Sequence, residues 1–173
     1  MKKLIQTYFL ILSIFTVTCN SVYAIEANNA CEVKIISEGK VAAEYEILKK
    51  ALESINPNWQ ADDENFSLLS TTNGLNLYLK GSKLNDLTPL QNFSFDTVWL
   101  IDANFKDVSF LQNSQNLRVL IVINSNKENS VLDCSYVPIK KLQKVSFKNI
   151  KLKNIDSLKN SKLLQDFKIE NEK

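Results

Sequence analysis

The stretch LNLYLKGSKLNDLTPLQNF, residues 75–93, decides the expected fold. Two later stretches repeat its apolar pattern, TVWLIDANFKDVSFLQNSQN at residues 97–116 and KVSFKNIKLKNIDSLKNSK at residues 144–162. In all three, apolar residues lie at offsets 0, 2, 7, 10 and 13 from a common starting residue. The starting residues are Leu77, Val98 and Val145, and the first two offsets recur from Leu120 and Phe167. The intervals of 21, 22, 25 and 22 residues indicate an internal repeat.

These offsets match one strand followed by one tight turn. Residues at offsets 0 and 2 point to the same side of a strand, and the residue between them points to the other side. Offsets 7, 10 and 13 have the spacing of a helical or 3₁₀ segment that covers the core. One such unit cannot bury its apolar face alone, so we expect an α/β solenoid of about five stacked units with parallel strands over residues 65–173. The alternative is an ordinary α/β domain with accidental spacing.

The segment LNDLTPLQNFS, with its relatives FKDVSFLQNSQ and LKNIDSLKNSK, resembles the leucine-rich repeats of bacterial internalin-like proteins. The likeness extends over residues 74–169. It implies a curved solenoid with a helical N-terminal cap. It also implies that the concave strand face binds other proteins and that the chain has no catalytic activity.

The sequence departs from this family in two places. The buried Asn that the family carries five residues after offset 0 is replaced by Ser82, Ala103, Ser125 and Ile150. Within the 25-residue interval, NSNKENSVLDCSY at residues 124–136 lacks the usual apolar spacing. We expect an inserted or distorted loop there.

The first 24 residues have the pattern of a secretory signal. Lys2 and Lys3 precede an apolar run, and a small-residue cleavage motif ends at Ala24. The run is shorter than the roughly 20 apolar residues that a membrane-spanning helix needs. We therefore expect residues 1–24 to be cleaved, leaving an exported chain, periplasmic or secreted, without a stable membrane span. The weaker alternatives are an uncleaved anchor and a lipoprotein modified at Cys19.

Residues 25–64 are expected to form an N-terminal cap. Residues 32–37 alternate as in a short strand. An apolar stripe with helical spacing follows, and Pro57 ends the helix because proline disfavours helical geometry in the residue before it. The stripe consists of Val41, Tyr45, Leu48, Leu52 and Ile55. The polar residues 56–64 are interpreted as a linker to the first repeat.

Signal cleavage would leave two cysteines, Cys31 and Cys134. An even pair in an exported protein predicts one disulfide. A bond between them would close a loop of about 100 residues, which the chain-entropy model values at roughly 4 to 5 kcal/mol. The bond requires Cα atoms within about 7 Å, whereas a cap normally contacts only the first repeat of a solenoid.

The charges are balanced but unevenly distributed. The whole chain carries a formal charge of +2, which argues against a nucleic-acid partner. Residues 25–64 hold nine acidic and four basic side chains, whereas residues 139–173 hold ten basic and four acidic ones. We interpret the lysines of the second segment as a solvated face, and a phosphate or lipid site there is the alternative.

No catalytic constellation is present in the sequence. The chain contains no histidine, which excludes His-based triads, His general bases and most catalytic zinc sites. With only three glycines it has neither a P-loop nor a dinucleotide fingerprint. The adjacent carboxylates of Asp62 and Asp63 fall in the polar linker, where solvation is the default. We expect a protein that is not an enzyme and needs no metal or cofactor.

The strand residues that point away from the core are the candidate binding site. In the first three repeats they are mostly apolar or aromatic, and in the last two they are charged. The residues we expect to bind a protein partner are Tyr78, Trp99, Ile101, Ile121, Ile123 and Lys148. Exposed apolar surface rimmed by charge is typical of protein contacts. The expected function is an exported protein-binding module, and the alternative is a periplasmic immunity or inhibitor protein that occludes a toxin or hydrolase.

Overall fold

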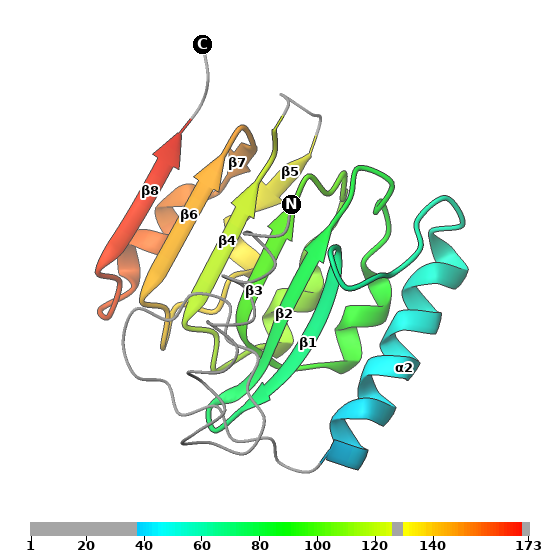
Figure 1. Ribbon diagram of the computed structural model, residues 1–173. Helices are drawn as coiled ribbons and strands as arrows, with labels where there is room; N and C mark the ends of the chain where they lie inside the picture. Colours follow the sequence, from blue (N-terminus) through cyan, green and yellow to red (C-terminus); the bar gives the residue numbers. More distant parts are fainter. Residues whose placement is uncertain (1–37, 126–129, 171–173) are drawn as a thin grey trace, which may run out of the picture.

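The computed structural model describes residues 38–125 and 130–170, without the side chains of residues 38–42. The predicted signal segment, the strand predicted at residues 32–37 and Cys31 lie outside the described residues. The described chain confirms the predicted α/β class, with a mostly parallel sheet and a long helix beside it (Figure 1).

Six strands form the main sheet in the order β1-β2-β3-β4-β6-β8. The first pair is antiparallel, and every later pair is parallel. The strands are β1 (Phe66–Thr71), β2 (Gly74–Lys80), β3 (Phe95–Ile101), β4 (Val119–Ile123), β6 (Lys144–Lys148) and β8 (Asp166–Glu170). A separate parallel pair consists of β5 (Val131–Asp133) and β7 (Lys151–Lys153).

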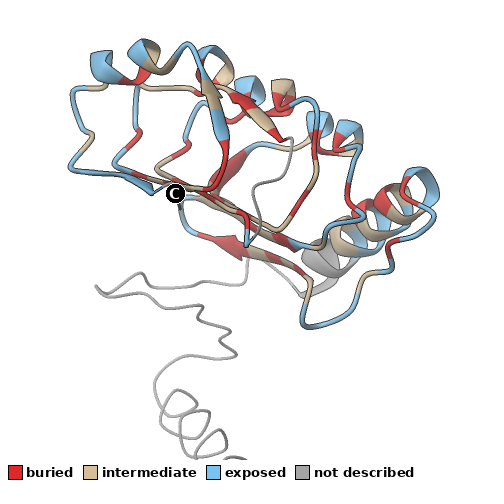
Figure 2. Ribbon diagram, turned by 90° about the horizontal axis from the view of Figure 1, so that it is seen from above, coloured by how far each residue is buried: buried red, intermediate tan, exposed pale blue. Residues whose placement is uncertain are grey.

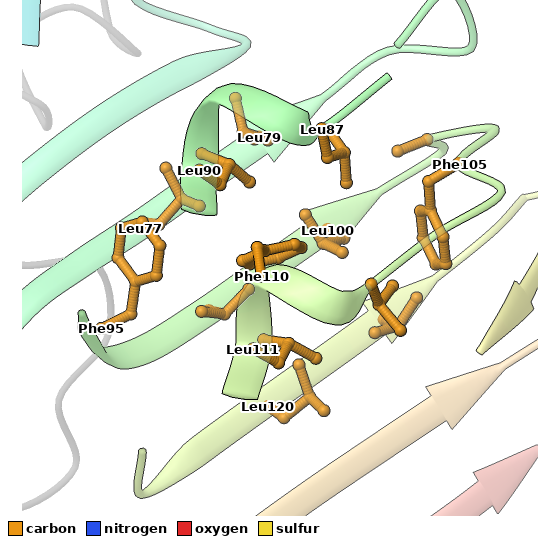
Figure 3. Packing of buried hydrophobic residues seen from close by; sticks show 14 of the residues in the cluster. Leu77, Leu79, Leu87, Leu90, Phe95, Leu100, Phe105, Phe110, Leu111 and Leu120 are labelled. Atoms are coloured by element: carbon orange, nitrogen blue, oxygen red, sulfur yellow. The ribbon is translucent and has the colours of Figure 1, made fainter. Parts of the chain in front are cut away.

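Short 3₁₀ segments follow the strands and lie on one side of the sheet, as Figure 2 shows from above. They are η1 (Thr88–Asn92), η2 (Ser109–Asn113), η3 (Cys134–Tyr136) and η4 (Ile155–Asn160). The core lies between these segments and the sheet (Figure 3). Leu77, Val98, Leu120 and Val145, four of the five predicted starting residues, are aligned across neighbouring strands and fully buried there.

The helix α2 (Glu38–Ile55) covers the β1 end of the sheet (Figure 1). Its Leu48 and Leu52 are buried, and the ring of Tyr45 stacks on Phe66 with centroids 4.7 Å apart. Ile55, predicted to belong to the same stripe, is exposed. The buried stripe continues from Leu52 to the next position one turn on, which is Asn56.

Asn56 fastens the end of α2 to the first repeat. Its Nδ2 donates to the carbonyls of Leu52 and Asp86, and its Oδ1 accepts from the amides of Asn85 and Asp86. Every polar atom of this buried amide is therefore paired, as burial requires. The predicted linker is thus part of the packed structure.

Trp59 completes the same contact. Its ring is buried against Phe66, and its Nε1 donates to the carbonyl of Lys80 at 3.0 Å. Gly81 has a φ of +140°, and a Cβ there would lie 2.9 Å from the Trp59 ring. Glycine is therefore required at this position both for its backbone conformation and for the close approach of the indole.

A β-hairpin starts the sheet, although no strand was predicted before the one that contains Leu77. The strands β1 and β2 are joined by a two-residue turn, Thr72 and Asn73, between the paired residues Thr71 and Gly74. Gly74 follows the turn with a φ of +142°, a conformation that favours glycine. The antiparallel β1 covers the edge of β2 that a purely parallel sheet would leave open.

A buried ion pair links β3 to the start of β4. Arg118 is the single arginine of the chain, and its Nε and Nη2 donate to the two carboxylate oxygens of Asp96 at 2.6 and 2.8 Å. Asp96 is only 1% exposed. A bidentate guanidinium compensates a buried carboxylate because both acceptor oxygens receive a charged donor.

Polar residues also connect the ends of neighbouring strands. Asp102, Asn124 and Asn149 each lie four residues after offset 0, one position earlier than the Asn of the internalin-like repeats. The Nδ2 of Asn149 donates to the carbonyl of Asn124, and the carboxylate of Asp102 accepts from the amide and hydroxyl of Ser125. Asp102 and Asn149 have a φ of +53°, a conformation that Asn and Asp tolerate better than other side-chain residues.

Three of the 3₁₀ segments begin with the same local contact, which we call the Asp clip. An aspartate accepts hydrogen bonds from the backbone N–H and the hydroxyl of the residue two positions later. The pairs are Asp86 with Thr88, Asp107 with Ser109 and Asp133 with Ser135. These bonds lower the pKa of Asp86, mainly through the Thr88 hydroxyl.

The clip also explains the segment predicted to be an inserted or distorted loop. Residues 126–129 are not described, and the chain after them forms β5 and η3 with the Asp clip in place. Cys134 follows Asp133 as Leu87 follows Asp86, and both Cys134 and Leu87 are buried in the core. Cys134 and Val137 therefore hold the positions of Leu87 and Leu90 with a displacement of four residues, and Leu132 holds that of Leu84 with a displacement of five.

Candidate functional site

The face of the sheet opposite the 3₁₀ segments carries the candidate site, and we call it the open sheet face. Along each strand, every second residue points into the core, and the residues between them point to the open sheet face. The register of the strands aligns these outward-pointing residues in rows across the sheet. The first row is Asn76, Thr97, Val119, Lys144 and Asp166. The second row is Tyr78, Trp99, Ile121, Ser146 and Lys168. The third row is Lys80, Ile101, Ile123, Lys148 and Glu170.

All six predicted binding residues lie in the second and third rows. Tyr78, Trp99 and Ile121 are neighbours in the second row, and Ile101, Ile123 and Lys148 are neighbours in the third. Five of the six are half-buried. Ile121 differs from the prediction of an exposed side chain, because only 6% of it is accessible.

Ile121 is the centre of the apolar part of this face. Trp99 and Ser146 stand beside it on the neighbouring strands, and Val119 and Ile123 stand two residues away on its own strand. It does not belong to the core on the other side of the sheet. Because only 6% of Ile121 is accessible, it supports its half-buried neighbours and offers little surface of its own to a partner.

The open sheet face also carries apolar residues that were not predicted to belong to it. Leu69 on β1 is opposite Asn76 and extends the first row, and Val119 belongs to that row as well. Leu69 was not predicted to lie on this face, because no strand was expected before the turn at Thr72 and Asn73. The apolar block therefore covers β1 to β4.

The charged part of the face lies over β6 and β8 and is internally paired. Lys144 contacts Asp166 at 3.0 Å, and Lys168 contacts Glu170 at 2.6 Å. The Lys168 ammonium, by hydrogen bond and by charge, and then Lys148 lower the pKa of Glu170. The lysines here face carboxylates, so this face offers mixed charge beside its apolar block.

Cys134 has no role on this face, because it lies in the core on the other side of the sheet. Burial raises the pKa of its thiol to about 11, so the thiol is protonated at neutral pH. It is free in the structure, and Cys31 lies outside the described residues. The disulfide between them stays a prediction, and it requires Cys31 to reach a fully buried sulfur.

A pocket of about 310 Å³ lies between η1 and η2, away from the open sheet face. Its acidic residues, Asp86 and Asp107, already accept hydrogen bonds in their clips. In the described part of the chain, no three His, Cys, Asp or Glu side chains gather to hold a metal ion. The α2 helix and every shorter helix described lack the length and apolar composition for crossing a membrane.

Comparison of the chain with protein-family models, with curated proteins and with solved structures gives no match.

Proposed function

We propose that this chain is a short leucine-rich-repeat solenoid that binds another protein through its open sheet face. It acts without catalysis, after export to the periplasm or the medium. The repeat assignment is supported by the aligned starting residues Leu77, Val98, Leu120 and Val145, and by the Asp clips that recur before the 3₁₀ segments.

The observation that carries the binding proposal is the apolar block on the open sheet face. Tyr78 and Trp99 stand side by side there, next to Ile121 and Ile101. Aromatic side chains are favoured anchors in protein interfaces because they provide a large contact area at a low entropic cost. Their positions on hydrogen-bonded strands hold them in place before a partner arrives, which reduces the cost of ordering them.

The charged strands next to the block supply the rim. Lys144, Lys168 and their carboxylate partners are exposed or half-exposed, so water reaches them. Rim charges mainly tune association rate and partner choice, and they contribute less to affinity than buried anchors. We therefore expect the affinity to come mainly from an apolar surface of the partner that covers the apolar block.

Affinity capture with the purified protein, followed by binding measurements on the captured partner, tests this proposal. Tyr78→Asp and Trp99→Asp each place a charge in the apolar block, and we expect each to weaken binding by about 30-fold. Gln112→Asp, on the exposed surface of η2, is the matched control and should leave affinity unchanged. Thermal unfolding of each variant separates lost binding from lost folding. Equal affinities of the three variants would remove this face as the binding site.

The export part of the proposal has its own measurement. The mass and the N-terminal sequence of the protein recovered from cell fractions show whether the chain begins at Ile25. An intact N-terminus in the cytosolic fraction would contradict export without bearing on the open sheet face. A captured partner that is a hydrolase or toxin, and whose activity falls on binding, would identify the protein as an inhibitor.

A further inference from the structure

Two exposed large apolar side chains lie next to each other on one side of β8, at the edge of the sheet. Phe167 and Ile169 are aligned with Val145 and Phe147 of β6 and point to the same side of the sheet. Val145 and Phe147 are fully buried, whereas Phe167 is 48% and Ile169 is 38% exposed. Residues with core positions in the repeat are therefore left accessible at this edge.

The backbone of β8 is also available for pairing. The N–H of Asp166 donates to Gln143, and the carbonyl of Glu170 accepts from Asn149, both on the β6 side. Because backbone polar groups alternate in direction along a strand, those of Phe167 and Ile169 point to the other edge. Among the described residues no strand pairs with that edge, which Figure 1 shows as the outermost one, opposite α2.

The charges on β8 discriminate between the ways in which a second β8 can pair with it. Asp166, Lys168 and Glu170 alternate in sign on the open sheet face. An antiparallel pair centred on Lys168 would oppose Lys168 to its own copy and Asp166 to Glu170, with like charges throughout. A pair centred on Phe167 opposes Asp166 to Lys168 twice.

The Phe167-centred register also pairs the apolar side chains and satisfies the outward-pointing backbone groups. It places Phe167 directly opposite its own copy, where aromatic cross-strand pairs stabilise a sheet. The two outward-pointing backbone groups of Phe167 then exchange a pair of hydrogen bonds. A register centred on Ile169 also opposes Lys168 to Glu170 twice, but it moves Phe167 opposite Asn171 and loses the aromatic pair.

We propose that the partner of the β8 edge is a second copy of this chain, paired antiparallel about a two-fold axis at Phe167. The two sheets then continue as one, and Phe167 and Ile169 of both copies are covered. This contact is isologous, so it closes at two chains and does not propagate into a filament. It leaves the apolar blocks of both copies free, because they lie over β1 to β4.

Sedimentation equilibrium of the purified protein tests the proposal. The expected result is a concentration-dependent dimer, and Phe167→Asp should give a monomer at the same concentrations. Lys168→Glu creates two like-charge pairs in the proposed register and should raise the dissociation constant by about tenfold. The double variant Asp166→Lys with Lys168→Glu restores opposite charges and should recover most of the affinity.

Site-specific crosslinking reports the register directly and introduces no charge at the centre of the edge. In a Cys31→Ser background, Phe167→Cys should form an inter-chain disulfide on oxidation, because residues opposite each other have Cα atoms about 5.5 Å apart. Lys168→Cys is the matched control, since residue 168 is opposite residue 166 and should crosslink weakly.

Three results would overturn the proposal. The first is a monomeric mass of the wild-type protein at every concentration. The second is a dimer that survives Phe167→Asp and is lost with Trp99→Asp, which would move the contact to the open sheet face. The third is a crosslink that forms at residue 168 in preference to residue 167, which would refute the register. Far-UV circular dichroism of each variant confirms that its fold is retained.

Discussion

The two ends of the sheet are built from similar strands and differ in what covers them. At the closed end, α2 and β1 cover the first repeat, and Leu77 and Leu79 of β2 are buried. At the open end, Phe167 and Ile169 of β8 hold the corresponding positions and remain accessible. The difference shows that an apolar strand residue is buried only when a neighbouring unit, helix or strand covers it. A single unit cannot provide this cover for its own residues.

The closed end predicts the largest loss of stability. Trp59→Ala removes a buried ring that packs on Phe66 and donates to the carbonyl of Lys80. We expect the free energy of unfolding to fall by about 4 kcal/mol, the usual range for truncating a buried aromatic. Urea unfolding followed by tryptophan fluorescence of the remaining Trp99 measures it. A loss below about 1 kcal/mol would show that α2 and its linker do not close this end.

A matched pair of ion-pair variants compares the interior with the open end. Arg118→Ala leaves the carboxylate of Asp96 buried without its partner and should cost about 3 kcal/mol. Lys144→Ala breaks the exposed pair with Asp166 and should cost less than about 1 kcal/mol. Chemical denaturation of both variants provides the comparison. Similar costs for the two would contradict the assignment of Asp96 as a buried charge that depends on Arg118.

The attachment of α2 depends on a single amide. Asn56→Ala leaves the carbonyl of Asp86 and the amides of Asn85 and Asp86 without their partner. We expect a loss of about 2 kcal/mol, because buried polar groups would be left unpaired. Hydrogen exchange should show faster opening of α2 than of β4. Uniformly faster exchange of both elements would mean that α2 and the sheet unfold as one unit.

The pKa of Cys134 tests whether water reaches the core near the open end. Its pKa is raised from 9.0 to about 11 by burial, so the folded state favours the protonated thiol. The resulting stability is present below pH 9 and is lost between pH 9 and 11, with a loss of about 1 kcal/mol by pH 10. Cys134→Ala isolates this effect, since the lysines titrate in both proteins. Parallel pH profiles of the two proteins would show that water reaches the thiol.

The open end predicts the smallest effect. Phe167→Ala removes a ring that is about half exposed, so in dilute monomeric protein the loss should be below about 1 kcal/mol. Thermal unfolding at low protein concentration measures it. A loss equal to that of Trp59→Ala would mean that β8 is covered as completely as β2.

Local patterns predicted the strands well and predicted their surroundings less well. The spacing that starts at Leu77 and Val98 identified both the buried side and the row order of the open sheet face. The same spacing at Phe167 carries no information on whether a next layer exists, so its exposure was not predicted. The core position of Cys134 after the clip at Asp133 was not predicted, because residues 124–136 lack the usual apolar spacing, and its disulfide with Cys31 stays a prediction.

Two other differences have similar causes. The buried role of Asn56 depends on Asn85 and Asp86, which are about 30 residues away in sequence, so no local pattern predicts it. The low exposure of Ile121 arises from its neighbours on three strands and was not apparent from β4 alone. Sequence reasoning therefore located the candidate face but not its centre.

The Asp clips have a consequence for how such a chain tolerates insertions. The contact between Asp133 and Ser135 forms downstream of residues 126–129, and β6 still pairs with β4 so that Val122 is opposite Phe147. The unit after the longer connection thus regains the same contact and the same strand register as the other units. Extra residues placed before it lengthen one connection and leave every later strand in frame.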